Sequence, residues 1–140
     1  MNYKILTGFV LIFASLFLPA QVSAQEWYDT ATFSCDAGPG DGFASVKIMG
    51  YADLRMRNVH EGAGPYIRYI DSISNERWVA QGPQVGVTVS DISVNAEKTG
   101  FNSAKMTVTY TESWRIGVGD FGLIEYRSRS VTRTCYQNNF

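Results

Sequence analysis

The chain has 140 residues, of which 12 are basic and 13 acidic, and it contains two cysteines and a single histidine. The near-neutral balance and the lack of a polybasic tract exclude a protein whose main partner is nucleic acid or a membrane surface. Two cysteines and one histidine without ligand spacing do not predict a metal centre. We therefore expect neither a metal nor a cofactor.

Residues 1–24 have the three parts of a secretory signal peptide. Lys4 supplies a positive start, residues 5–18 form an uncharged apolar run, and residues 22–24 read Val-Ser-Ala, a small-residue cleavage motif. The apolar run is short for a membrane span, and its retention as a membrane anchor is the alternative. We expect cleavage after Ala24, which leaves residues 25–140 as a single secreted or periplasmic domain without stable membrane insertion. Loss of Lys4 leaves 11 basic and 13 acidic residues, a net charge of about −2.

Cys35 and Cys135 lie near the two ends of the expected domain. In an oxidising compartment such a pair predicts a disulfide, and two buried free thiols are the alternative. The bond would close a loop of about 100 residues, which the chain-entropy model values at roughly 4–5 kcal/mol.

Alternation of apolar and polar residues, the pattern of half-buried strands, recurs through residues 25–140. In chain order it predicts strands at residues 30–35, 44–57, 66–73, 77–80, 85–96, 104–116 and 123–136. The strand at 104–116 is the clearest, because every even position except Glu112 is apolar and every odd position is polar. Stretches rich in glycine and proline predict the loops at 36–42, 60–65 and 82–83.

Breaks in the alternation predict irregularities within or between these strands. Gly50 is expected to mark a bend or bulge in the strand at 44–57, and residues 74–76 to form a turn that joins two strands into a hairpin. Changes of parity predict two further bulges, one near Ser90 and Asp91 and one between Arg127 and Ser130. About seven strands without a helix predict an all-β fold, either a single antiparallel, immunoglobulin-like β-sandwich or a small β-barrel, with one disulfide.

Glu112 is the one charged residue on the apolar face of the strand at 104–116. A buried carboxylate is costly unless it is paired. A hairpin centred on Asp120 would place Trp114 opposite Tyr126 and Ile116 opposite Ile124, and the predicted bulge would direct an arginine of residues 127–129 toward Glu112. We favour a structural Glu–Arg pair over a ligand-contacting acid or a catalytic acid.

Two groups of arginines share a strand parity: Arg55 with Arg57, and Arg127 with Arg129 and Arg133. Such a ladder on an exposed sheet face could bind an anionic glycan, a lipid headgroup or an acidic protein patch. A solvated face, or charges that prevent edge-to-edge strand pairing, is the alternative. Tyr51 and Phe43 are the aromatic residues that we expect to be exposed. The candidate binding residues are Arg55, Arg57, Tyr51, Arg127, Arg129, Arg133 and Glu112.

No catalytic residue is assigned. Residues 117–122 spell G-x-G-x-x-G, but a strand rather than a helix follows them, so we interpret them as a hairpin loop and not as a dinucleotide site. His60 lies in a glycine-rich loop without a catalytic motif, and a surface position is the simpler interpretation. A small secreted hydrolase that uses Glu112 or His60 is kept as an alternative.

The motif Phe-Ser-Cys-Asp-Ala-Gly at residues 33–38 resembles the opening of the periplasmic C-type lysozyme inhibitors, a family of small disulfide-bearing β-barrels. The chain has no counterpart of that family's serine- and tyrosine-containing inhibitory motif, so the resemblance assigns no site residue. We predict a non-catalytic protein that binds another protein or an envelope component, as an inhibitor, immunity or accessory factor. A surface-assembly subunit that uses an open edge strand is a further alternative, and the oligomeric state is left open.

Overall fold

The computed structural model describes residues 23–38, 46–82, 86–120 and 122–140. The expected signal peptide lies almost entirely outside these ranges, and so does Phe43. Within them, no helix is long and apolar enough to cross a membrane.

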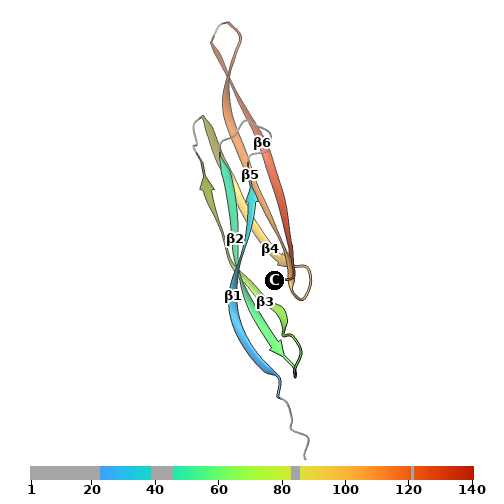
Figure 1. The fold of residues 1–140 in the computed structure, drawn as a ribbon. Helices are drawn as coiled ribbons and strands as arrows, with labels where there is room; N and C mark the ends of the chain where they lie inside the picture. The colour runs from blue at the N-terminus through green and yellow to red at the C-terminus, as the bar shows by residue number, and fades with distance from the viewer. Residues whose placement is uncertain (1–22, 39–45, 83–85, 121) are drawn as a thin grey trace, which may run out of the picture.

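The described residues form two antiparallel sheets of three strands each (Figure 1). The strands are β1 (Gln25–Ala37), β2 (Lys47–His60), β3 (Ile67–Gln81), β4 (Val87–Lys98), β5 (Ser103–Val118) and β6 (Leu123–Asn138). One sheet has the order β1-β2-β3 and the other has the order β4-β5-β6. The all-β prediction is therefore confirmed. The closed barrel is wrong, and the sequential strand order lacks the Greek-key crossovers of an immunoglobulin domain.

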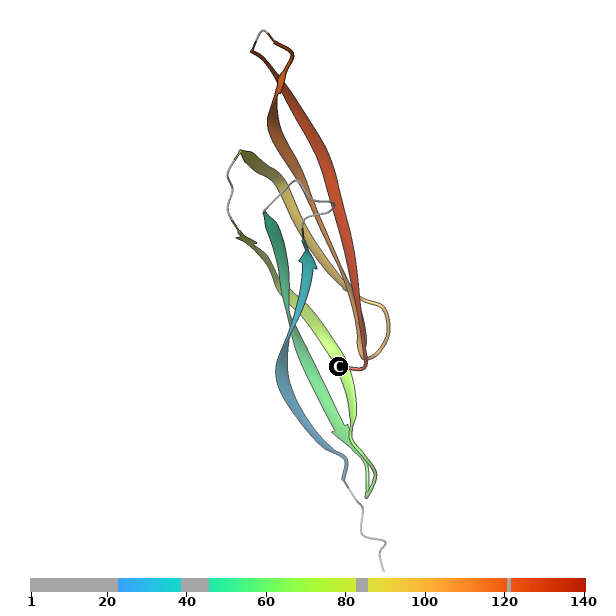
Figure 2. The ribbon, with the colours of Figure 1, turned by 45° about the horizontal axis from the view of Figure 1, so that its top comes forward.

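The core lies between the two sheets, where alternate residues of each strand point inward. On β5 the even positions from Ala104 to Glu112 are buried, and on β2 the even positions from Ile48 to Asn58 are buried. The two sheets are displaced along the long axis of the molecule, so that the β5–β6 hairpin extends beyond one end and the start of β1 beyond the other (Figure 1, Figure 2).

Gly50 lies where the second sheet packs tightly against β2, and not at a bend. It pairs regularly with Cys35 on one side and Trp78 on the other. A Cβ atom at this position would lie 2.6 Å from Cγ2 of Val108 and 3.0 Å from the sulfur of Met106. A larger residue would therefore push the sheets apart, which is why the chain needs glycine here.

The predicted hairpin at residues 66–80 is wrong, because residues 67–80 belong to the single strand β3. The polar residues 74–76 form a β-bulge: Tyr51 faces Arg77 and Asp53 faces Ser74, which leaves one more residue on β3 than on β2. Asn75 takes up the bulge with a φ of 54°, a left-handed conformation that asparagine tolerates well. The described residues therefore form six strands instead of the seven predicted.

The bulge predicted near Ser90 is confirmed, because the β4–β5 register shifts between Ser90 and Ser93 and Asp91 has a φ of 54°. The second predicted bulge, between Arg127 and Ser130, is wrong. β5 and β6 pair without interruption from Ser103 opposite Asn138 to Val118 opposite Leu123.

The β5–β6 hairpin is displaced by one residue from the predicted register. Trp114 lies opposite Arg127, and Ile116 lies opposite Glu125. A displacement of one residue turns each side chain of a strand to the other face. With this register, the odd positions of β6 face inward along the whole strand, so no bulge is needed between Arg127 and Ser130. Tyr126 lies exposed on the outer face.

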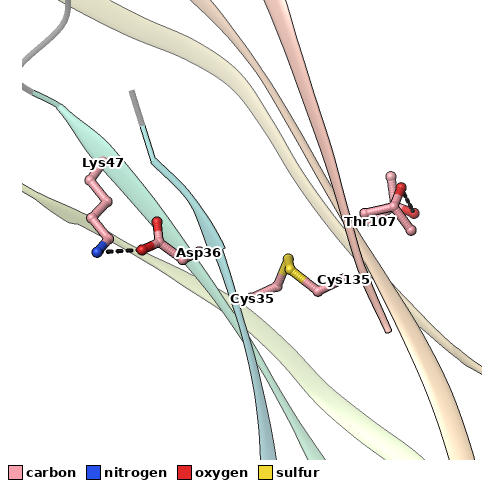
Figure 3. Close-up of a disulfide and its surroundings, with 6 residues drawn as sticks. Cys35, Asp36, Lys47, Thr107 and Cys135 are labelled. Atoms are coloured by element: carbon pink, nitrogen blue, oxygen red, sulfur yellow. Dashed lines mark hydrogen bonds and ion pairs between the residues drawn. A yellow bond between two sulfur atoms is a disulfide. The ribbon is translucent and has the colours of Figure 1, made fainter. Parts of the chain in front are cut away.

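The predicted disulfide between Cys35 and Cys135 is confirmed, with 5.6 Å between the two Cα atoms (Figure 3). It joins edge strand β1 of one sheet to edge strand β6 of the other, so it links the sheets across the open side of the sandwich. Asp36, which was predicted in a loop, continues β1 and forms an ion pair with Lys47 (Figure 3).

Candidate functional site

The outer face of the first sheet carries three arginine side chains stacked on tyrosine rings. The guanidinium carbon lies 4.5 Å from the ring centre in the Arg55–Tyr28 pair and 4.8 Å in the Arg57–Tyr69 pair. In the third pair, Arg77 lies 5.6 Å from the ring centre of Tyr51. We call this surface the Arg–Tyr face; it comprises Tyr28, Tyr51, Arg55, Arg57, Tyr69 and Arg77.

Strand alternation brings these side chains to one face. The odd positions of β2 point away from the core because its even positions are buried. The register then places Tyr28 and Tyr69 directly opposite Arg57 on the two neighbouring strands. Arg77 lies opposite Tyr51, so all three stacks are contacts between neighbouring strands.

Acidic residues balance the arginines of the Arg–Tyr face. Arg57 contacts Glu26 at 3.0 Å and Asp71 at 3.8 Å. Arg55 lies 4.0 Å from the same Asp71 carboxylate, and Arg77 binds Asp53 at 3.1 Å. Three arginines thus meet three carboxylates, and the face is close to neutral.

Asp53 is held as a carboxylate. It accepts a hydrogen bond of 2.7 Å from the amide of Asn75 and one of 3.1 Å from Arg77. These hydrogen bonds lower the pKa of Asp53 below its ordinary value. The β3 bulge therefore has a local role, because it directs Asn75 toward the acid that orders Arg77.

A shallow depression of about 210 Å³ opens on the Arg–Tyr face, and residues of all three strands of the first sheet line it. Its wall includes Tyr28, Asp53 and Arg55, together with the hydroxyl groups of Thr30 and Ser74. The depression is smaller than the pockets that enclose drug-sized ligands, which span about 300–1,000 Å³. Its size suits a single side chain of a partner.

The second arginine group of the sequence lies elsewhere, on the inward-facing side of β6 in the other sheet. Arg127 binds Glu125 at 3.2 Å, and both side chains are exposed. Arg133 lies opposite Val108 and is also exposed. The structure therefore does not combine Arg127, Arg129 and Arg133 with Arg55 and Arg57 into one basic patch.

Glu112 is paired with Arg129, as the sequence indicated. The Glu112 side chain is 1% exposed, and its Oε2 accepts a hydrogen bond of 2.7 Å from Nε of Arg129. The two residues are direct neighbours in the β5–β6 register, so no bulge is required to bring them together. Next to them, the hydroxyl group of Tyr110 donates a hydrogen bond of 3.0 Å to the carbonyl oxygen of Ala37. Burial and the Glu112 carboxylate raise the pKa of Tyr110.

His60 lies at the end of β2, opposite Gln25, and is partly exposed. In the part of the chain that the structure describes, no group of three or more histidine, cysteine, aspartate and glutamate side chains could hold a metal ion. The G-x-G-x-x-G segment joins strands β5 and β6, with Gly119 and Gly122 at φ values of 76° and 69°. The predicted hairpin between two strands is confirmed, but Gly117 and Val118 still belong to β5, and Phe121 lies outside the described residues.

Half of the Arg–Tyr face was missed by the sequence analysis. Tyr51, Arg55 and Arg57 share the outward parity of one strand, which alternation alone reveals. Tyr28 and Tyr69 lie beside them because of the register between neighbouring strands. The alternation within a single strand does not reveal that register. The sequence signal for them is an aromatic residue at an outward position of a strand that neighbours the arginines.

Comparison with known proteins adds no assignment to these observations. No family model, curated protein or solved structure matches the chain. The interpretation of the site rests on its own geometry.

Proposed function

We propose that the chain is a secreted or periplasmic, non-catalytic binding protein that recognises another protein through the Arg–Tyr face. Three arginine–tyrosine stacks on one exposed and charge-balanced sheet face carry this proposal. Tyrosine and arginine are among the residues most enriched at the centres of protein interfaces.

The stacks lower the entropic cost of binding. A free arginine side chain loses much of its rotamer freedom when a partner immobilises it. Arg57 is already held between the ring of Tyr69 and the carboxylate of Glu26. Arg55, with a side chain that is 59% exposed, still presents most of its surface to a partner.

The charge balance of the face favours a protein over a polyanion. A surface that binds anionic glycans or lipid headgroups needs uncompensated positive charge. Each arginine of the Arg–Tyr face has a carboxylate within 4.0 Å. Planar rings, paired charges and a depression for one side chain instead match the mixed chemistry of a folded partner.

The position of Glu112 favours a structural role over hydrolysis. A general acid must reach its substrate, whereas the Glu112 side chain is 1% exposed and bound to Arg129. A surface-assembly role through edge strand β6 is also less favoured, because its Arg127 and Arg133 are charges of the kind that discourage strand addition.

The test uses the full chain, exported through its own leader and purified with its disulfide formed, as bait in envelope and culture-supernatant extracts. The double variant Arg55→Ala/Tyr28→Ala removes one stack of the Arg–Tyr face. Its matched control is Arg115→Ala/Tyr126→Ala, which removes an arginine–tyrosine stack of 5.7 Å from the other sheet.

We expect wild type and control to retain the same stoichiometric protein partner, and the Arg55→Ala/Tyr28→Ala variant to bind it at least about tenfold more weakly, as for loss of a hot spot. Unchanged melting temperatures would show that all three proteins are folded. Equal capture by both variants would contradict the proposal, and so would retention of a glycan or lipid without a protein.

A further inference from the structure

The displacement of the two sheets leaves part of each inward face uncovered, at opposite ends of the molecule (Figure 1, Figure 2). On β5, the inward-facing even positions are buried up to Glu112, and the next two, Trp114 and Ile116, are only partly buried. On β1, the inward-facing odd positions from Ala37 back to Phe33 are buried, whereas Trp27 on the same face is 38% exposed. We call these two uncovered surfaces the tip and the base.

The base belongs to the first sheet and combines aromatic rings with incompletely bonded polar groups. The rings of Trp27 and Tyr66 meet edge to face, with their centres 5.3 Å apart. Beside them, Arg68 donates to Asp29 at 2.6 Å and to Asn58 at 3.0 Å. Asn58 is fully buried, yet its side-chain nitrogen finds no acceptor among the described residues, and neither does one oxygen of Asp29 find a donor.

The tip belongs to the second sheet and is mainly apolar. Trp114 and Ile116 on β5 face the inward side, together with Leu123 at the start of β6, which is 66% exposed. The charges beside them, Glu125 and Arg127, bind one another. An apolar surface with a neutralised rim is a surface that gains free energy when it is covered.

We propose that the tip of one copy of the protein packs on the base of the next copy. The tip and the base are inward faces of different sheets, so they face in opposite directions. A second copy that is shifted along the long axis, and rotated as strand twist requires, therefore places its base against the tip of the first copy. The two faces then pack against each other in the same way as the two sheets within one copy. The sandwich then continues from copy to copy.

Both surfaces gain from this contact. The side chains of Leu123 and Trp114 leave water against the rings of Trp27 and Tyr66, and Leu123 and Tyr66 are 66% and 51% exposed in a single copy.

The contact is head-to-tail and therefore open-ended. It is also small: the tip extends about six residues beyond Glu112, or roughly 20 Å at 3.3 Å per residue. A contact of this length belongs with the small, weak interfaces, which bury less than about 1,200 Å². We expect weak, concentration-dependent chains of copies, and this contact is independent of the Arg–Tyr face.

Sedimentation velocity over a range from about 10 µM to about 1 mM tests the proposal on the exported chain. Leu123→Glu alters the tip and Tyr66→Glu alters the base. The side chains of Leu123 and Tyr66 are 66% and 51% exposed, so the fold tolerates both substitutions. Tyr126→Glu is the matched control, because Tyr126 is on the same hairpin but on its outer face.

Wild type and Tyr126→Glu are expected to form dimers and larger species as concentration rises, whereas Leu123→Glu and Tyr66→Glu alone remain monomers. A one-to-one mixture of these two monomeric variants should form dimers and stop there, because one intact tip meets one intact base. A monomeric wild type at the highest concentration would overturn the proposal. Dimers of Tyr66→Glu alone would also overturn it, because they would show a symmetric tip-to-tip contact.

Discussion

Loss of Arg129 is expected to destabilise the protein far more than loss of a neighbouring surface arginine. Glu112 is 1% exposed and Arg129 is 32% exposed, so Arg129→Met leaves an uncompensated carboxylate in the core. Removal of one partner of a buried ion pair costs about 3–5 kcal/mol. Because Arg129 is partly hydrated, we expect the lower value, about 3 kcal/mol.

Urea unfolding followed by the fluorescence of the three tryptophans measures this change. The matched control is Arg127→Met, which breaks an exposed pair with Glu125 and should cost between about 0 and 1 kcal/mol. The double variant Glu112→Leu/Arg129→Met replaces the pair by apolar side chains and should return to within about 1 kcal/mol of wild type. If Arg129→Met costs no more than Arg127→Met, the burial argument for Glu112 is refuted.

Three further changes test the fold. Cys35→Ala/Cys135→Ala opens a link across 100 residues and should lower the free energy of unfolding by about 4–5 kcal/mol in urea; a loss below about 2 kcal/mol would argue against the sheet link. Gly50→Ala should cost about 1–3 kcal/mol in the same assay because its Cβ meets the second sheet, whereas Gly117→Ala, with open space around it, should change stability by less than about 0.5 kcal/mol. Because the pKa of Tyr110 is raised above its usual 10.0, the unfolded state loses this proton first and stability falls as pH rises above that value. Tyr110→Phe should remove that part of the alkaline slope in urea midpoints, and an unchanged slope would contradict the burial of a protonated phenol.

Strand alternation was sufficient to predict the buried face of β5. The even positions from Ala104 to Tyr110 are buried, and Glu112 meets an arginine as expected. The disulfide followed from the number of cysteines and the expected compartment. These features depend on local periodicity or on simple pairing, which the amino-acid order contains directly.

Strand register was not predictable in the same way. A single-residue difference in the β5–β6 hairpin decides whether Trp114 faces Tyr126 or Arg127, and the loop composition fits either choice. A polar triplet such as residues 74–76 is equally compatible with a turn and with a bulge, and pairing with β2 selects the bulge. The same limit hid half of the Arg–Tyr face.

The role of the Arg–Tyr face is tested most directly by site-specific photocrosslinking in the full chain with its disulfide formed. A photoreactive phenylalanine analogue replaces Tyr28 in one variant and Tyr126 in the other, so that the same chemistry is placed on the outer faces of the two sheets. We predict one crosslinked protein partner from position 28 and none from position 126. A partner crosslinked from position 126 alone would contradict the account, because it would place the binding surface on the opposite sheet.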